Sequence, residues 1–390
     1  MPRLTAIVPA KNGLATLAPC ARAIHAAADS PEELIVVTKP PTVGPVVARN
    51  VGARQATGDV LVFVDADVLV HDDVFRRIRA AFDADPALTA VFGSYDDAPA
   101  APGVVSVFRN LLHHHVHQSS PGPATTFWTG LGAVRRDAFM AVGGFDDERF
   151  NGPEIEDIEL GASLVDAGAR IVLDPSIQGT HLKAWSLRAM VTTDFLHRGV
   201  PWVKLLLRNR EAPSELNLAW RHRVSAVACL TALFGLVARR PAASIAASMT
   251  FLGLNRRFYR LLLARRGPVQ AVAGVGLHAL HHLTAVASVP AGLWSHVQER
   301  RQTRLAEAPA PVYQAPPESQ PREPHTAEPL TAEPQPLTAE PRTAEPLTAE
   351  PQAASNGGPP GRFAKKTQLV TENGGAEPLI PVSDEARART

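Results

Sequence analysis

The chain has 390 residues, and its 39 basic and 38 acidic side chains give a formal net charge of +1 at pH 7. This balance excludes a globally basic nucleic-acid-binding protein, so we expect no nucleic-acid partner. The two cysteines, Cys20 and Cys229, exclude a disulfide framework and disfavour a cysteine-based metal site. The apolar run at the N-terminus is too short for a signal peptide, which predicts a cytoplasmic location for the first region.

Strands and helices alternate along the first hundred residues. Short apolar runs predict strands at 4–9, 33–38, 60–64 and 88–92, and longer runs predict helices at 14–28, 45–56 and 72–84. This alternation predicts an α/β fold with a mainly parallel sheet that helices cover on both faces. Ligands of such sheets bind outside the carboxyl ends of the strands, so we expect the chemistry in the loops after Val8, Val37 and Val64.

Asp65 and Asp67 directly follow the third predicted strand, VLVFV. Two carboxylates one residue apart at a strand's carboxyl end can hold a hard divalent cation against a diphosphate. Acidic residues are also common in turns that bind nothing. The residues by themselves leave both interpretations open.

Residues 113–139 combine clustered histidines with a glycine-rich turn. His113 and His117 are four residues apart and could share a helix face, as zinc ligands do, but no carboxylate follows at metalloprotease spacing. A polar segment that faces substrate or an interface is therefore favoured over a metal site. We predict a strand over 126–130 (TFWTG), in which Gly130 is suited to a close backbone approach.

The stretch GPEIEDIEL, residues 152–160, places four carboxylates within six positions. The pattern that follows predicts a helix from Glu156 to Ala167, with Gly168 as its stop signal. The helix dipole favours acids in a first turn by about 0.3–1 kcal/mol each, which accounts for one or two of them. A carboxylate beside another, when partly buried, can instead act as a general base near neutral pH. Four acids favour the second interpretation.

An apolar zone follows over residues 216–300, with segments at 224–238, 242–254 and 268–294 separated by arginines. The third segment is long enough to span a bilayer, which takes about 20 residues. The first two are short, and could form a hairpin, a re-entrant pair or helices that lie flat at the interface. We therefore predict a helical membrane-associated region of two or three segments. A soluble helical subdomain is the alternative.

Residues 301–390 form a tail rich in Pro, Ala, Glu and Thr, in which TAEP occurs five times. Proline at this density blocks helix and sheet hydrogen bonds, and few apolar side chains remain for a core. The composition predicts a disordered tail that acts as a spacer or, alternatively, recruits partners.

Four blocks of the sequence, in this order, resemble the family 2 glycosyltransferases of GT-A fold. They are TAIVPAKNG, GPVVARNVGARQATGDVLVFVDADV, GAVRRDAFMAVGGFD and EDIELG, and the resemblance spans residues 4–210. It implies a GT-A catalytic domain over residues 1–215, a nucleotide-diphospho-sugar donor, and Mg²⁺ or Mn²⁺ as cofactor.

The resemblance also implies roles for residues at the donor site. Asp67 is the implied metal ligand, and His181 a further contact to metal or phosphate. The chain departs from the family after the second strand, where Thr38 and Lys39 stand in place of acidic residues and leave the nucleotide base open. The implied contacts to the nucleotide-sugar are Pro9, Ala10, Asn12, Thr38, Arg49, Asp65 and Gly130.

At the acceptor side, the resemblance implies that Asp157 is the general base of an inverting reaction and that Glu156 orients the acceptor or its neighbour. Glu159, expected to pair with a cation, is grouped with Arg198 and Trp202 as a candidate for acceptor or phosphate contact. A membrane-bound chain favours transfer to a hydroxyl or phosphate of a lipid-linked or membrane-associated acceptor, with the catalytic domain on the cytoplasmic side of the cell membrane. The alternative is a catalytically inactive membrane scaffold or nucleotide-binding protein with a partner-recruiting tail.

Overall fold

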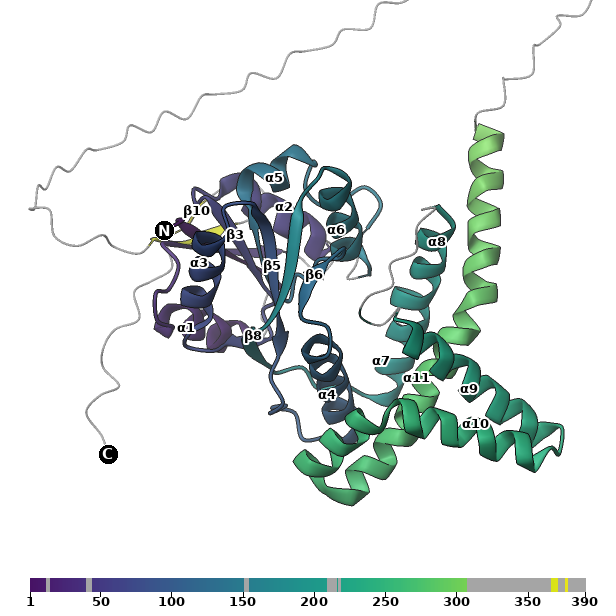
Figure 1. The fold of residues 1–390 in the computed structure, drawn as a ribbon. Helices are drawn as coiled ribbons and strands as arrows, with labels where there is room; N and C mark the ends of the chain where they lie inside the picture. The colour runs from purple at the N-terminus through teal and green to yellow at the C-terminus, as the bar shows by residue number, and fades with distance from the viewer. Residues whose placement is uncertain are drawn as a thin grey trace, which may run out of the picture. The chain divides into compact units, whose positions relative to one another are not determined.

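A computed structural model describes residues 1–11, 15–39, 44–150, 154–208, 216, 219–306, 366–370 and 376–377. The chain divides into two compact units, Met1–Arg301 with Lys365–Thr390, and Gln302–Ala364. The sheet, the cavity and the helices discussed below belong to the first unit (Figure 1).

The first unit is built on a mixed sheet in the strand order β10-β9-β2-β1-β3-β7-β5-β8-β4, with β6 paired to β8. Six strands run in one direction, because β1 is parallel to β2 and β3, β2 to β9, and β5 to β8, while β7 runs antiparallel between β3 and β5. The mainly parallel α/β sheet predicted from the sequence is confirmed. The strands are β1 Leu4–Lys11, β2 Glu33–Lys39, β3 Val60–Val64, β4 Val68–Val70, β5 Leu88–Tyr95, β6 Gly122–Ala124, β7 Leu131–Arg135, β8 Arg170–His181, β9 Lys366–Val370 and β10 Ala376–Glu377.

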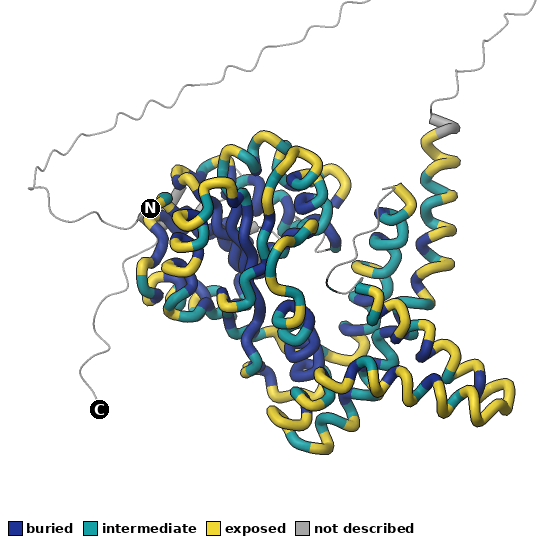
Figure 2. Tube along the Cα trace, in the orientation of Figure 1, coloured by how far each residue is buried: buried dark blue, intermediate teal, exposed yellow. Residues whose placement is uncertain are grey.

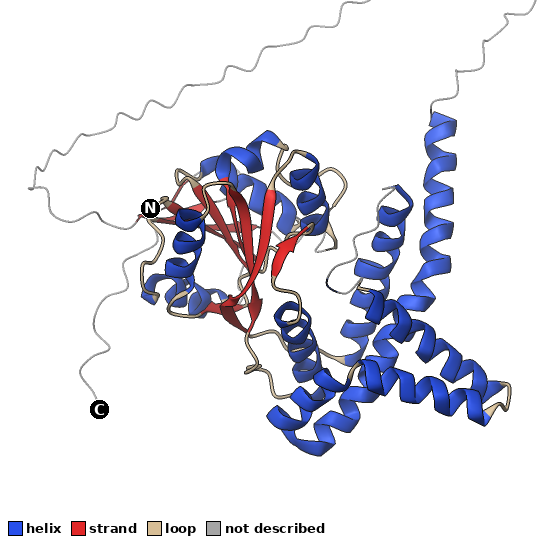
Figure 3. Ribbon diagram, viewed as in Figure 1, coloured by secondary structure: helices blue, strands red, loops and turns tan. Residues whose placement is uncertain are grey.

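Helices cover both faces of the sheet (Figure 3). Strand β3 shows why, because its side chains alternate between the faces and all five are buried. Val62 belongs to the core on the side of α1 and α3, whereas Phe63 belongs to the core on the side of α2, α5 and α6. These helices are α1 Leu17–Ala26, α2 Pro45–Gln55, α3 Val74–Ala84, α5 Arg136–Ala141 and α6 Glu156–Asp166. Figure 2 shows the buried strands between the partly exposed helices.

A helical region follows the sheet domain, with α4 Val104–Gln118 inserted earlier in the chain. Its elements are α7 Leu187–Thr192, the π-helix η1 Thr193–Gly199, α8 Val200–Arg208, α9 Trp220–Val237, α10 Pro241–Leu254 and α11 Arg256–Ala306. All three predicted apolar segments lie in helices, and α11 carries a non-helical residue, Gly267, at φ +78°. By length and composition alone, the stretch Arg256–Thr303 could cross a membrane.

Two predictions differ from the structure. Residues 126–130 form a loop, and the strand begins one residue later at Leu131, because Gly130 packs beneath the Trp128 ring at a turn. The tail, predicted to be disordered, supplies β9 and β10 at the edge of the sheet. Segment β9, KTQLV, contains no proline, so every backbone N–H remains available for pairing. The TAEP repeats lie outside the described residues.

Candidate active site

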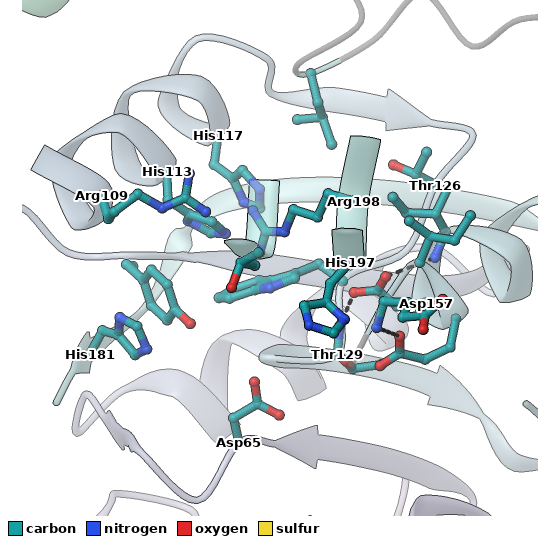
Figure 4. Close-up of a pocket in the computed structure, with 18 of the residues that line it drawn as sticks. Asp65, Arg109, His113, His117, Thr126, Thr129, Asp157, His181, His197 and Arg198 are labelled. Atoms are coloured by element: carbon teal, nitrogen blue, oxygen red, sulfur yellow. Dashed lines mark hydrogen bonds between the residues drawn. The ribbon is translucent and has the colours of Figure 1, made fainter. Parts of the chain in front are cut away.

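A cavity of about 410 Å³ lies at the carboxyl edge of the sheet, where β3, β5 and the start of α6 meet the helical region (Figure 4). It brings together eight residues singled out from the sequence: Arg49, Asp65, Asp67, Glu156, Asp157, His181, Arg198 and Trp202. Blocks more than one hundred residues apart in the chain therefore share one pocket, as the resemblance implied.

Arg49, on α2, joins two of these blocks. Its Nη2 donates to Asp65 Oδ1 at 2.8 Å, and its Nη1 donates to Glu156 Oε1 at 2.9 Å. The residue is only 3% exposed. Burial alone would lower the pKa of Arg49, but the charges of Asp65 and Glu156 outweigh burial and raise it. The guanidinium is thus a permanent charge that fixes both carboxylates.

Glu156 has both carboxylate oxygens engaged. Oε1 accepts from Arg49, and Oε2 accepts from the backbone N–H of Glu154 at 2.8 Å. With both oxygens engaged by protein donors, Glu156 holds the entry into α6 and is not arranged to contact an acceptor directly. The expectation that it orients its neighbour fits this geometry better.

Asp157 occupies the first turn of α6 and faces the cavity. Its Oδ1 accepts from the backbone N–H of Ile158 at 2.9 Å, and its Oδ2 lies 3.5 Å from the backbone N of Thr129. Burial, together with the negative charge of Glu156, raises the pKa of Asp157 from 3.8 to about 7, against the opposing charges of Arg49 and Arg198. A carboxyl group with this pKa exchanges protons readily near neutral pH.

Asp67 and His181 form a second polar group, because β4 pairs with β8 and brings Val68 opposite His181. Asp67 Oδ2 lies 3.6 Å from His181 Nε2, and the Tyr95 ring stacks on His181 at 4.2 Å between centroids. Burial would raise the pKa of Asp67, but His181 and the charge of Lys183 lower it overall. Figure 4 shows His181 and Asp157 on opposite sides of the pocket.

The Asp67–His181 pair has the right chemistry for a Mg²⁺ or Mn²⁺ ion shared with substrate. Within the described residues, no group of three or more His, Cys, Asp and Glu side chains is placed to hold a metal. Such ions commonly take only one or two protein ligands and complete their shell with phosphate oxygens and water. Carboxylate oxygens suit Mg²⁺ and Mn²⁺ alike.

The clustered histidines of α4 form part of the cavity wall instead of a metal site. His113 lies 4.0 Å from His117 and 4.3 Å from Tyr95 between ring centroids, and both imidazoles also contact the Trp128 ring. Burial lowers the pKa of His117 to about 4 and holds that of His113 well below its usual value. Both rings are therefore neutral at physiological pH.

Sequence reasoning missed a buried ion cluster beside the pocket. Asp194, in η1, binds Arg109 of α4 at 2.9 Å and His281 of α11 at 2.7 Å. Both Arg109 and His281 line the cavity. The only local signal is that η1 is a π-helix, a feature common at functional sites, and such a helix cannot be read from composition.

Five other predicted site residues lie outside the cavity lining: Pro9, Ala10, Thr38, Gly130 and Glu159. Pro9 and Ala10 are paired with Val37 and Thr38 between β1 and β2. A Cβ on Gly130 would overlap the Trp128 ring, so its close approach is to that side chain. Glu159 pairs with Arg149, the cation partner expected for it. Asn12 lies outside the described residues.

Comparison with known proteins shows which families part of this chain is similar to. Residues 20–143 match the family model described as glycosyl transferase family 2. The pre-mycofactocin glycosyltransferase of two Mycobacterium tuberculosis strains is 26% identical over 182 residues, which cover 43% of this chain. The matched region is 36% of that protein, so the chain spans about a third of the length of its curated relatives.

Among solved structures, a mannosyltransferase from Pyrobaculum calidifontis, in complex with GDP-Man and Mn²⁺, is similar at a TM-score of 0.45 and 18% identity, over 75% of this chain and 88% of that one. The structure of GalNAc-T7 with UDP, GalNAc and Mn²⁺ is similar at a TM-score of 0.39 and 13% identity, over 58% of this chain and 51% of that one. Residues 20–143 are thus similar to glycosyl transferase family 2, and part of the chain is similar to a curated glycosyltransferase.

Proposed function

We propose that this protein is an inverting glycosyltransferase that moves a sugar from a nucleotide-diphospho-sugar to an acceptor hydroxyl or phosphate. The observation that carries the proposal is the pocket position of Asp157, whose pKa is raised to about 7 by burial and by Glu156. A base with this pKa is matched to proton removal near neutral pH. The family 2 match over residues 20–143 supports the same activity.

The donor would bind at the end of the pocket that holds Asp65 and Asp67. Asp67 and His181 would hold the divalent ion, which neutralises charge on the departing diphosphate. Asp65, held by Arg49, would contact the nucleoside. Lys183 and Arg198 also line the pocket and supply positive charge for phosphate oxygens.

The transfer step needs one base and no covalent intermediate. Asp157 takes the proton of the acceptor hydroxyl as its oxygen forms a bond to the anomeric carbon. The bond between that carbon and the diphosphate oxygen breaks on the opposite face, the electron pair leaves with the nucleoside diphosphate, and the configuration inverts. Asp157 then returns its proton to water. Arg49 pairs with Glu156, and the negative charge of Glu156 raises the basicity of Asp157.

The acceptor is proposed to be lipid-linked or membrane-bound, and the protein to reside at the cell membrane with this domain cytoplasmic. The support is the apolar helical region, because one of its residues, His281, lines the pocket. A membrane-bound acceptor would therefore meet the pocket on the side of α11.

A donor screen tests the proposal. Purified full chain is incubated with nucleotide-diphospho-sugars and Mg²⁺ or Mn²⁺, and release of nucleoside diphosphate is measured. We expect metal-dependent release with at least one donor, and a large loss in Asp157→Asn. If calorimetry detected no binding of any nucleotide or nucleotide-sugar, the alternative of a non-catalytic membrane scaffold would replace the proposal.

A further inference from the structure

Helices α9 and α10 form an antiparallel hairpin. Near its tip, Ser244 Oγ donates to Ala232 O at 2.8 Å, and at its open end Asn255 Nδ2 donates to Ser225 Oγ at 2.8 Å. The side of α9 that faces the protein is buried through His222, Ser225, Ala228, Cys229 and Gly235. The two helices therefore stay together along their length and present one outer face.

That outer face is apolar. On α9, Val227, Leu230, Phe234 and Val237 follow one another at intervals of three or four residues and are 45–74% exposed, and on α10 Ile245 and Met249 are each 64% exposed. A helix face directed to water is normally polar. Apolar side chains that are both this exposed and adjacent to one another mark a surface that another partner covers.

The charge around this face identifies the partner. Between Ala219 and Gln298 the sequence has nine arginines and no Asp, Glu or Lys. An apolar surface bordered by arginines complements the acyl chains and the anionic headgroups of a lipid bilayer. It does not complement a second copy of itself, because arginines would then face arginines.

The arginines also set the orientation of the hairpin. Arg239 and Arg240 form its tip, and Arg221 and Arg256 stand at its open end. The apolar part of α9, residues 224–238, is about 22 Å long at 1.5 Å per residue, which is shorter than a hydrocarbon core of about 30 Å. An upright hairpin would place the tip arginines among acyl chains, which is costly. A flat hairpin places every arginine at headgroup level.

Helix α11 could span a bilayer by length, but its contacts tie it to the catalytic domain at short intervals. Arg265 pairs with Asp97, Gln270 Nε2 donates to Val104 O at 2.9 Å, and His281 binds Asp194. Glu299 pairs with Lys204 and Arg208 of α8, a helix anchored in the sheet domain's core through Leu205.

Between His281 and Glu299, Ser288 packs against Gly199 of η1, and Gly292 packs against Val203 of α8. The widest interval between attachment points is therefore the eleven residues from Gln270 to His281. A span needs about 20 residues free of such contacts. In this structure α11 therefore runs along the catalytic domain and does not cross a membrane.

We propose that the α9–α10 hairpin is an in-plane anchor that binds the surface of an anionic membrane, and that α11 connects this anchor to the active-site pocket. The packing supports the connection, since the ring of His282 lies 6.1 Å from that of His222 on α9, and the adjacent His281 lines the pocket. The identity of the acceptor that the anchor would meet at the pocket rests on the proposed function.

Vesicle flotation of the full chain tests the anchor. Vesicles contain phosphatidylcholine alone or with phosphatidylglycerol, and the variants are Phe234→Glu and, as matched control, Ala80→Glu, which adds the same charge to the exposed surface of α3. We expect the wild type and the control to float with anionic vesicles, and Phe234→Glu to lose at least about ten-fold of the bound fraction, as burial of one aromatic side chain implies. Equal flotation of all three would overturn the proposal.

A depth measurement tests the orientation. A fluorophore is attached at Val227→Cys or Ala238→Cys, and quenching is compared between lipids spin-labelled near the headgroup and near the chain end. A flat hairpin predicts similar, shallow quenching at both sites. Deep quenching at residue 238 alone would show that the hairpin enters tip first. Failure to bind vesicles, with a concentration-dependent dimer in light scattering, would assign the face to a second copy.

Donor hydrolysis without vesicles separates the two proposals. We expect Phe234→Glu to hydrolyse the donor at the wild-type rate while it fails to bind vesicles. Wild-type protein that binds anionic vesicles and hydrolyses no donor would refute the proposed function and leave the anchor intact. Wild-type protein that hydrolyses donor and binds no vesicle would refute the anchor alone.

Discussion

Arg49 and Glu156 form an ion pair of 2.9 Å, in which each side chain is only 4% exposed, although 107 residues separate them in the chain. The same guanidinium binds Asp65. The pair therefore joins the end of the pocket that holds Asp65 to the helix that carries Asp157.

Removal of this charge should destabilise the fold. In Arg49→Ala, Glu156 loses this charged partner while it stays buried, so we expect a loss of about 3–5 kcal/mol in the free energy of unfolding. Arg49→Lys should recover part of the loss, because one ammonium cannot donate to both carboxylates in the geometry of the guanidinium. Urea unfolding measures the free energy of unfolding of both variants. Arg76→Ala, which breaks an exposed contact with Asp73, should change stability by less than about 0.5 kcal/mol.

Asp157→Asn should reduce transfer by about 10²–10⁴-fold and leave donor binding within a few-fold of wild type. The wild-type rate should rise with pH through about 7 and level off above it, because the base acts in its ionised form. Initial rates across pH and calorimetry of donor binding test this. A variant with full activity would remove Asp157 from the mechanism.

The same residue should make stability depend on pH. The pKa of Asp157 is raised above its unfolded value by burial and by Glu156, so the native state binds more protons and loses stability as pH rises from about 4 to about 7. Asp157→Asn removes this pH-dependent contribution to stability. Its melting temperature should therefore rise relative to wild type as the pH is raised through this window, and a constant difference would contradict the assignment.

The Asp194 cluster should make stability depend on pH in the opposite direction. Burial opposes ionisation of Asp194, but Arg109 and His281 outweigh it and lower its pKa. Its stabilisation is therefore present above pH about 4, the unfolded pKa, and is lost as pH falls through the lowered native value. Asp194→Asn should cost about 3–5 kcal/mol at neutral pH, because Arg109 stays buried without its partner. Thermal unfolding at several pH values tests both statements.

Chelation should abolish transfer if Asp67 and His181 hold the metal. We expect activity after EDTA treatment to return with Mn²⁺ or Mg²⁺, and His181→Ala to need a higher metal concentration for half-maximal rate, by about 10–100-fold. His113→Ala serves as control, because His113 lines the same pocket but packs against His117 on α4. An equal shift in metal requirement for both variants would contradict the assignment to His181.

Part of the fold was readable from sequence because local patterns carry it. The VLVFV strand and the alternating runs around it define a sheet buried on both faces, since each side chain must find a core. The order of the motifs likewise indicated that Arg49, Asp65, Asp67 and Asp157 belong to one site. These features depend on residue type and spacing, and the sequence contains both.

Only the tertiary structure decided which atoms meet. The sequence does not reveal that Arg49 forms ion pairs with both Asp65 and Glu156, because these pairs require α2, β3 and α6 to converge. The Arg109–Asp194–His281 cluster draws one residue from each of three distant helices, and its electrostatics depend on burial that no local pattern encodes. The apolar helices show the same division: their composition predicted membrane contact, while the contacts that tie α11 to the catalytic domain determined the geometry proposed for it.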